Sequence, residues 1–430
     1  MPILLFYLVV LFLSESVILV RCDEVQILLE LKKSLGVSDE SWTPNNAPCQ
    51  FAGVTCTTKS VSAIDLTNKS LPGYLSFDTI CQLSSLQKLS LGYNDLSGPI
   101  RPSLNNCTKL QHLDLAFNYL IGHIPDFSSL TELRVLNLSD NAFTGPVPWT
   151  SLFQKTKLTD FLIGDNPSLD RSLFPEELTS LHRLTTLYLS NCSLHGPIPP
   201  SIGNLTKLIV LELSVNSLTG PIPQEITRLT KLFQLELWKN QLTGTIPPNF
   251  RKLTELANLD FSSNNMGGDL TELKYLTKLQ SLQLFYNQFS GEVPVEYGDF
   301  DNLVDLSIYN NMFYGQHPQN LGSKSDFDAI DVSTNSFTGP IPPNMCWLGK
   351  MTYMALLENQ FTGEIPASYA SCTTLKRFRV SNNSPTFALE TTPRWTQMLD
   401  PSLFPEEVTS LRESIICIIT GIKMKNNKFQ

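Results

Sequence analysis

A frame of leucines, one asparagine and one glycine recurs about every 24 residues along most of this 430-residue chain. Three copies read LQKLSLGYNDLSGPI, LQHLDLAFNYLIGHI and LIVLELSVNSLTGPI, which share the pattern L-x-x-L-x-L-x-x-N-x-L-x-G-x-I. The asparagine slot occurs fourteen times, 23 to 26 residues apart, at Lys69, Asn94, Asn118, Asn141, Asn166, Cys192, Asn216, Asn240, Asn264, Asn287, Asn311, Asn335, Asn359 and Asn383. A series this long predicts a stack of structural repeats.

Each copy predicts one short strand followed by a turn. In L-x-L the leucines alternate with polar residues, so the leucines face inward and the residues between them face outward. The asparagine amide can satisfy backbone groups of adjacent turns, and the following Gly and Ile-Pro end strand pairing. No copy buries its leucines alone, whereas stacked copies share one core. This leucine-rich-repeat signature predicts an α/β fold, a solenoid that curves as a right-handed superhelix with a parallel concave sheet.

The chain divides into four segments. Residues 1–22 are expected to be a secretory signal peptide, because Ile3–Leu13 is an unbroken apolar run too short for a secure membrane span. Residues 23–60 contain a short amphipathic helix, ILLELKKSL, and 61–384 carry the repeats. Residues 385–430 break the frame, and we expect an irregular tail with neither a membrane span nor a kinase domain.

A secretory route allows the nine cysteines to oxidise. Cys49 and Cys56 lie close together in PCQFAGVTC and are expected to form a disulfide, while the pairing of the other cysteines stays open. Six N-x-S/T sequons fit the same compartment, at Asn68, Asn106, Asn137, Asn191, Asn204 and Asn382. We therefore expect a glycoprotein in the secretory pathway.

Composition and motifs exclude several classes of function. The net charge of −9, without a basic stripe, argues against nucleic acid as a partner. The sequence has no glycine-rich phosphate loop, no metal-ligand cluster and no nucleophile–His–Asp set. We therefore expect a chain without enzymatic activity that binds no metal and no cofactor.

The outward residues of the strands form a column with six acidic members and one basic member. Between the two strand leucines it runs Asp65, Ser90, Asp114, Asn137, Leu162, Tyr188, Glu212, Glu236, Asp260, Gln283, Ser307, Asp331, Ala355 and Arg379. Arg377 lies two residues before Arg379, so both side chains project from one face, about 6.5–7 Å apart along the strand. Two interpretations stay open, a solvated pair of cations and two donors that grip one carboxylate.

Aromatic residues accompany the later strands. They are Trp238, Phe285, Tyr286, Tyr309 and Tyr353, and each lies beside a strand leucine. Exposed aromatics in a groove are typical anchors of peptide-binding surfaces, although such residues also serve core packing. An extended peptide of about a dozen residues spans about 40 Å, or roughly eight strands. A ligand held at the arginine pair would therefore reach back to the copy containing Glu212 or Trp238.

The N-terminal segment, the L-x-G-x-I-P repeats and the R-x-R strand together resemble the ectodomain of plant peptide-hormone receptor kinases of the HAESA and HAIKU type. The resemblance covers about residues 1–384 and implies that the N-terminal segment caps the open end of the core. Phe51 stands where that family commonly has tryptophan. In the family the R-x-R pair holds the free C-terminal carboxylate of a secreted peptide, a role that falls here on Arg377 and Arg379.

The resemblance also implies a smaller leucine-rich-repeat co-receptor kinase as a second partner. We expect an extracellular, glycosylated ectodomain, truncated before the membrane span and the kinase domain that place full-length relatives in the plasma membrane. Two alternatives stay open. One is a secreted inhibitor of microbial cell-wall hydrolases that docks through the acidic column and is indifferent to the arginine pair, and the other is a non-functional fragment.

Overall fold

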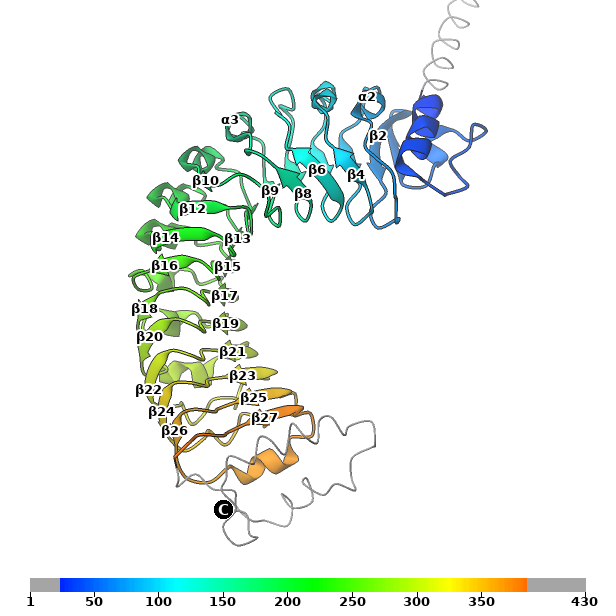
Figure 1. The fold of residues 1–430 in the computed structure, drawn as a ribbon. Coiled ribbons are helices and arrows are strands. Elements are labelled where there is room, and N and C mark those ends of the chain that lie inside the picture. The colour runs from blue at the N-terminus through cyan, green and yellow to red at the C-terminus, as the bar shows by residue number, and fades with distance from the viewer. Residues whose placement is uncertain (1–23, 385–430) are drawn as a thin grey trace, which may run out of the picture. The chain divides into compact units, whose positions relative to one another are not determined.

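The computed structural model describes residues 24–384, in which short strands alternate with single helical turns (Figure 1). The chain divides into two compact units after His195. The predicted signal peptide and the predicted tail lie outside the described residues. The repeats of each unit place one strand per copy in a main sheet, and this arrangement confirms the predicted leucine-rich-repeat solenoid.

The main sheet has 15 strands, which are parallel except for the antiparallel pair β1 and β2. The first unit contributes β1 (Val54–Thr57), β2 (Ser60–Asp65), β3 (Lys88–Ser90), β5 (His112–Asp114), β7 (Val135–Asn137), β9 (Asp160–Leu162) and β11 (Thr186–Tyr188). The second unit contributes β13 (Val210–Glu212), β15 (Gln234–Glu236), β17 (Asn258–Asp260), β19 (Ser281–Gln283), β21 (Asp305–Ser307), β23 (Ala329–Asp331), β25 (Tyr353–Ala355) and β27 (Arg377–Arg379).

Smaller parallel sheets form after the asparagine slot of each copy. Their strands are β4 (Ser97–Pro99), β6 (Tyr119–His123), β8 (Ala142–Thr144), β10 (Ser172–Leu173), β12 (Leu194–Pro197), β14 (Ser217–Pro221), β16 (Gln241–Thr243), β18 (Gly267–Gly268), β20 (Gln288–Gly291), β22 (Met312–Gln316), β24 (Ser336–Gly339) and β26 (Gln360–Phe361). They coincide with the extra L-x-G-x-I-P part of the frame, and in the copies that have its proline the missing N–H limits further pairing.

One longer helix lies in the N-terminal segment, and short helical segments connect the strands. They are a helix over residues 24–35, η1 (Pro48–Gln50), α2 (Phe77–Ile80), η2 (Pro102–Asn106), α3 (Trp149–Leu152), η3 (Glu176–Ser180), η4 (Pro200–Asn204), η5 (Gln224–Arg228), η6 (Phe250–Lys252), η7 (Leu273–Tyr275), η8 (Val295–Asp299) and η9 (Ala367–Ser371). None of the described helices is long and apolar enough to cross a membrane.

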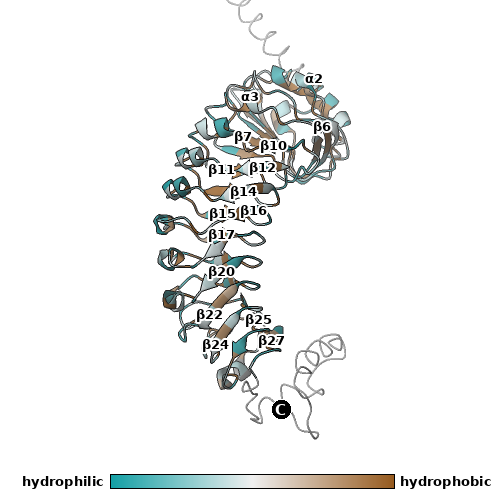
Figure 2. Ribbon diagram, turned by 60° about the vertical axis from the view of Figure 1, so that its left-hand side comes forward, coloured by the Kyte–Doolittle hydropathy of each residue, from teal (hydrophilic) through white to brown (hydrophobic). Residues whose placement is uncertain are grey.

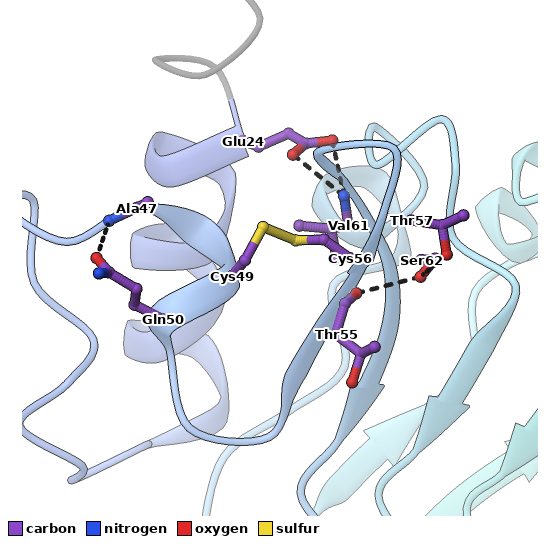
Figure 3. The surroundings of a disulfide bond; sticks show 9 residues. All are labelled: Glu24, Ala47, Cys49, Gln50, Thr55, Cys56, Thr57, Val61 and Ser62. Carbon is purple, nitrogen blue, oxygen red and sulfur yellow. Dashed lines mark hydrogen bonds between the residues drawn. A yellow bond between two sulfur atoms is a disulfide. The ribbon is translucent and has the colours of Figure 1, made fainter.

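The N-terminal helix is fixed to the first strands of the main sheet. The Glu24 carboxylate accepts hydrogen bonds of 3.2 Å from the backbone N–H of Val61 (Figure 3). The expected disulfide between Cys49 and Cys56 is present and links η1 to β1 (Figure 3). These contacts hold the N-terminal segment at the end of the stack, which is the position that a cap requires.

Phe51, at a position where the resemblance implies a tryptophan, is buried against Trp42. The two ring centroids lie 5.2 Å apart, and both side chains are at most 2% exposed. The Trp42 indole N–H donates to the Ala52 carbonyl at 3.0 Å, so its polar atom is satisfied. The substitution therefore leaves a closed aromatic core in this segment.

The predicted asparagine ladder is present, and Asn264 illustrates its geometry. Its Oδ1 accepts from the Leu242 N–H at 3.0 Å, and its Nδ2 donates to the carbonyls of Leu237, Phe261 and Ser262 at 3.0–3.1 Å. One amide thus satisfies backbone groups of the preceding turn as well as its own. Unpaired backbone groups would be costly in a core this dry, and the ladder removes them.

Apolar side chains fill the interior of each copy. The strand leucines are buried, as Leu235 and Leu237 show, and apolar positions recur from strand to strand (Figure 2). In the second unit a stack of buried phenylalanines runs through successive copies, with ring centroids 6.2–6.5 Å apart, at Phe289, Phe313, Phe337 and Phe361. Stacked copies therefore share one core, as the frame predicts.

Two disulfides that the sequence left open join neighbouring copies. Cys81 bonds to Cys107 and Cys346 bonds to Cys372, and each pair is separated by 26 residues. That separation is close to one period, which places both partners on adjacent turns of the stack. The two equal separations of 26 residues could have indicated both pairings from the sequence. Cys192 occupies an asparagine slot and is buried, where its Sγ donates to the Leu189 carbonyl.

His317 occupies the isoleucine slot of its copy and is buried in the apolar core. Its ring lies 4.1 Å from the Phe337 ring and 5.7 Å from the Phe361 ring, measured between centroids. Neither ring nitrogen has a hydrogen-bond partner among the described residues. Burial therefore disfavours the charged imidazolium and lowers the pKa of His317 from 6.5 to about 3.

Replacing His317 by isoleucine should remove an acid-sensitive loss of stability. Below pH 6.5 the unfolded chain binds a proton that the folded chain rejects, so the free energy of unfolding falls as the pH falls from 6.5 towards 3. The loss is about 1.4 kcal/mol per pH unit, or about 2 kcal/mol at pH 5. Urea unfolding at pH 7 and pH 5 measures it. Equal pH dependence in wild type and His317→Ile would contradict this account.

Candidate functional site

The exposed face of strands β19 to β27 is in strict register. Tyr353 pairs with Arg377 and Ala355 pairs with Arg379, and the preceding pairs run to Ala329 and Asp331. Consecutive strands lie about 4.8 Å apart, so residues of one column are neighbours. The sequence column is therefore a real row of side chains in the second unit.

Arg377 is exposed and rests on an aromatic side chain. Its Cζ lies 5.7 Å from the centroid of the Tyr353 ring, which is a cation–π distance. The Tyr353 hydroxyl donates to Asp331 Oδ2 at 3.0 Å, which fixes the ring beneath the guanidinium. Asp331 is fixed in turn, because its Oδ1 accepts from the Ser333 N–H at 3.0 Å. Three repeats thus contribute to the placement of one arginine.

Arg379 is exposed beside the small, buried side chain of Ala355. Burial raises the pKa of Tyr353, as does Asp331, while Arg379 and Arg377 lower it, so both guanidinium groups lie near this hydroxyl. Within residues 24–384 no carboxylate lies within 4.0 Å of either guanidinium. The structure therefore brings two arginines together at one end of the sheet and leaves their donors open.

Three of the predicted aromatics form one cluster. The Phe285 and Tyr309 rings are stacked with centroids 4.7 Å apart, and Tyr286 meets Tyr309 edge-on at 5.1 Å. Tyr286 is 51% exposed, whereas Phe285 and Tyr309 are half-buried. Burial, followed by the neighbouring Tyr286, raises the pKa of Tyr309 to about 12. The cluster is an amphipathic surface with hydroxyl groups at its edge.

Trp238 lies apart from that cluster. It follows β15 and is half-buried, and no ring contact joins it to another aromatic of the described residues. The copy between Trp238 and Phe285 has Ser262 at the equivalent position, so no aromatic ring connects Trp238 to the cluster there. The five predicted aromatics therefore make one cluster of three, one partner of Arg377 and one separate indole.

The acidic part of the column contains contacts that the sequence pattern did not indicate. The Gln234 amide donates to Glu212 Oε1 and to Glu236 Oε1, each at 2.7 Å, and so bridges two carboxylates. Burial raises the pKa of Asp260 to about 6, against the lowering effect of its hydrogen bonds from Ser262. The Gln234 bridge joins two neighbouring copies, so only the register of the strands could have indicated it. The pKa of Asp260 depends on its burial, which the spacing of the residues does not give.

The six sequons fall on different parts of the surface. Asn68, Asn106, Asn204 and Asn382 are exposed, whereas Asn137 and Asn191 are half-buried. Asn137 lies on β7, where its Oδ1 accepts from the Ser139 N–H at 3.2 Å. Asn382 follows Arg379 by three residues and has a left-handed backbone, with φ of 56°.

Among the described residues no three metal-binding side chains lie together as a group that could hold a metal ion.

Comparisons with known proteins agree with this fold. Residues 114–313 match the family model of the leucine-rich repeat region, 22–57 match the leucine rich repeat N-terminal domain, and 85–107 match a single leucine rich repeat. The chain is thus a leucine-rich-repeat protein with the N-terminal segment that accompanies such repeats.

Its relatives are plant receptor kinases. Receptor-like protein kinase 7 of Arabidopsis thaliana is 52% identical over 191 residues, which are 43% of this chain and 20% of that protein. Receptor-like protein kinase HAIKU2 of the same plant is 44% identical over 191 residues, 41% of this chain and 19% of that protein. The solved Arabidopsis receptor kinase HAESA, in complex with the peptide hormone IDA and the co-receptor SERK1, has a TM-score of 0.75 and 34% identity.

The chain is homologous to the ectodomains of plant leucine-rich-repeat receptor-like kinases of the HAESA and HAIKU type. The HAESA match covers 84% of this chain and 65% of the solved chain, and the two curated matches cover about a fifth of those kinases. Residues 24–384 are taken up by the N-terminal segment and the repeats. These residues therefore correspond to the extracellular part of such a kinase.

Proposed function

We propose that the chain is an extracellular ligand-binding region that recognises a secreted peptide by its free C-terminal carboxylate. The observation that carries the proposal is the pair Arg377 and Arg379, two exposed guanidinium groups without an acidic partner in residues 24–384. The other charged members of the column that contains Arg379 are all acidic. The peptide hormone in the HAESA complex supports the class of ligand.

The chemistry of the site follows from the arrangement of the donors. A guanidinium presents a planar fork of N–H groups that matches the two oxygens of a carboxylate. Each such contact contributes about 1.5–3 kcal/mol when the groups are shielded from water. The stacking of Arg377 on Tyr353 holds one fork in place before the ligand arrives, which lowers the entropic cost of binding.

The rest of the peptide would run along the exposed face of the second unit. Phe285 belongs to the copy four strands before β27, about 19 Å away, which an extended chain covers in about six residues. The cluster of Phe285, Tyr286 and Tyr309 would then contact the middle of the ligand. A peptide of about a dozen residues would extend to Trp238 or Glu212.

A smaller leucine-rich-repeat co-receptor kinase is the second partner that we propose, since the HAESA structure contains the co-receptor SERK1. In this proposal the described residues bind the peptide and carry out no phosphoryl transfer. Their place is outside the cell, which agrees with the disulfides and the exposed sequons.

A panel of secreted plant peptides, each made as a free acid and as a C-terminal amide, tests the proposal. Titration onto the purified chain should identify a peptide acid that binds. Its amide should bind at least about 30-fold more weakly, because it lacks the negative charge that both guanidinium groups would bind. Equal affinity of a bound acid and its amide would contradict the proposal. So would a chain that binds a microbial cell-wall hydrolase and none of the peptides.

Tyr353 should act as a positioning residue for Arg377. Tyr353→Leu removes the ring under the guanidinium and should weaken binding of the peptide acid about 2- to 5-fold, the worth of an exposed cation–π contact. Tyr353→Phe keeps the ring and should cost less than about 2-fold. Calorimetric titration measures both. Tyr314, which is 53% exposed on β22, is the matched control, and an equal effect of Tyr314→Leu would contradict this role.

A further inference from the structure

A second row of side chains follows the strands of the first unit. The residue before each asparagine slot has a left-handed backbone, with φ of 51° to 56°, at Asn68, Tyr93, Phe117, Asp140, Asp165 and Asn191. The backbone N–H of Asn68 donates to Gly92 O at 3.0 Å, and that of Tyr93 donates to Ala116 O at 2.9 Å. Successive members are therefore neighbours, about 4.8 Å apart.

Two aromatic rings stand exposed within this row. Tyr93 is 55% exposed and Phe117 is 42% exposed, and their rings are stacked with centroids 4.2 Å apart. They belong to the first unit, whereas every side chain of the proposed peptide site belongs to the second. The proposed function therefore does not account for them. The two stacked rings together form a contiguous exposed apolar surface, unlike apolar residues that are exposed singly.

Phe117 packs on one face of the Tyr93 ring, and Tyr93 is still 55% exposed. On the side of Tyr93 away from Phe117, the next member of the row is Asn68. Asn68 is exposed and begins the sequon Asn68-Lys69-Ser70. A sugar attached to the Asn68 amide would therefore start at the position in the row next to the exposed Tyr93 ring.

We propose that the Tyr93–Phe117 pair is the binding surface for the N-linked glycan of Asn68. The apolar C–H face of a pyranose complements the face of an aromatic ring, and the Tyr93 hydroxyl can exchange hydrogen bonds with sugar hydroxyls. The sequon at the end of the row identifies this occupant, since no second molecule is needed to bring a sugar to the rings. The glycan covers apolar surface and stabilises the first copies of the stack.

Asn191, at the other end of this row in the first unit, provides a control glycosylation site. Asn191 begins the sequon Asn191-Cys192-Ser193 and has the same left-handed backbone. Its neighbours in the row are the carboxylates Asp165 and Asp140, and its Nδ2 donates to Asp165 Oδ1 at 3.1 Å. A glycan at Asn191 would meet no aromatic face of the row, so its removal should not affect the Tyr93 region.

The test uses the full chain secreted from plant cells, with occupancy of Asn68 determined by peptide mass spectrometry. Asn68→Gln and Ser70→Ala both abolish the sequon, and each should speed amide hydrogen exchange over residues 88–123 about 2- to 10-fold. Neither change should affect exchange in a Tyr93→Ser/Phe117→Ser background, or in Tyr93→Ser alone if the double variant does not fold. Asn191→Gln should leave exchange over 88–123 unchanged.

Several results would overturn the proposal. One is the absence of a glycan on Asn68 in the secreted wild-type chain. Another is amide exchange over residues 88–123 that stays unchanged when the sequon is removed. The acceleration could also be equal with and without the two rings, which would assign it to the sequon itself. Finally, a dimer of the wild-type chain that is lost in Tyr93→Ser/Phe117→Ser would assign the surface to a second copy.

Discussion

Replacing Asn264 by alanine should lower the free energy of unfolding by about 3–5 kcal/mol. The side chain is 7% exposed and forms four hydrogen bonds with backbone groups of two successive turns. Alanine would leave one buried N–H and three carbonyls with fewer partners, in a core that admits little water. The loss would extend to neighbouring copies, because each copy is stable only through its contacts with the next.

Asn265 provides the matched control for this prediction. It is the next residue in the chain and is exposed, so Asn265→Ala should change the free energy of unfolding by less than about 0.5 kcal/mol. Urea unfolding followed by circular dichroism measures both variants under the same conditions. Similar small losses in the two variants would show that the ladder contributes little to stability.

Replacing both Arg377 and Arg379 by alanine should weaken binding of the peptide acid about 10²- to 10⁴-fold. Two charge-assisted contacts of about 1.5–3 kcal/mol each account for this range. Both side chains are exposed and neither has an ionic partner in residues 24–384, so the free energy of unfolding should barely change. The loss of affinity would therefore report on the site alone.

Two further variants sharpen this prediction. Lys376→Ala removes the exposed cation next to the pair and should change affinity less than about 3-fold, since a solvated charge contributes little. Arg377→Lys/Arg379→Lys keeps both charges but loses the planar forks, so its affinity should fall between those of wild type and the double alanine variant. A double alanine variant that binds like wild type would refute the carboxylate site.

The repeat frame was sufficient to predict most of the fold. The strand leucines and the asparagine ladder follow from spacing alone, because each depends on residues within one copy or at a fixed offset. Outside the repeats, the Cys49–Cys56 disulfide was predictable because the two cysteines lie close together in the sequence. The frame did not reveal that His317 is a buried member of the core. A histidine in an apolar slot has no distinguishing pattern, so only the packed structure shows that its nitrogens lack partners.

The candidate site was predictable in its register but not in its contacts. The column placed Arg379 in line with Ala355 and Asp331, and the structure has the same register. The stacking of Arg377 on Tyr353 depends on side-chain rotamers, which no spacing rule determines. For the same reason the five aromatics could not be sorted by sequence into a cluster, an arginine partner and a separate indole.

A thermodynamic cycle between the ligand's carboxylate and the arginine pair measures directly whether the two groups bind each other. One bound peptide, as acid and as amide, is titrated calorimetrically onto wild type and onto Arg377→Ala/Arg379→Ala. We expect amidation to weaken binding at least about 30-fold in wild type and less than about 3-fold in the variant, because the variant lacks the partners of the carboxylate. An equal amidation penalty in both proteins would contradict this expectation.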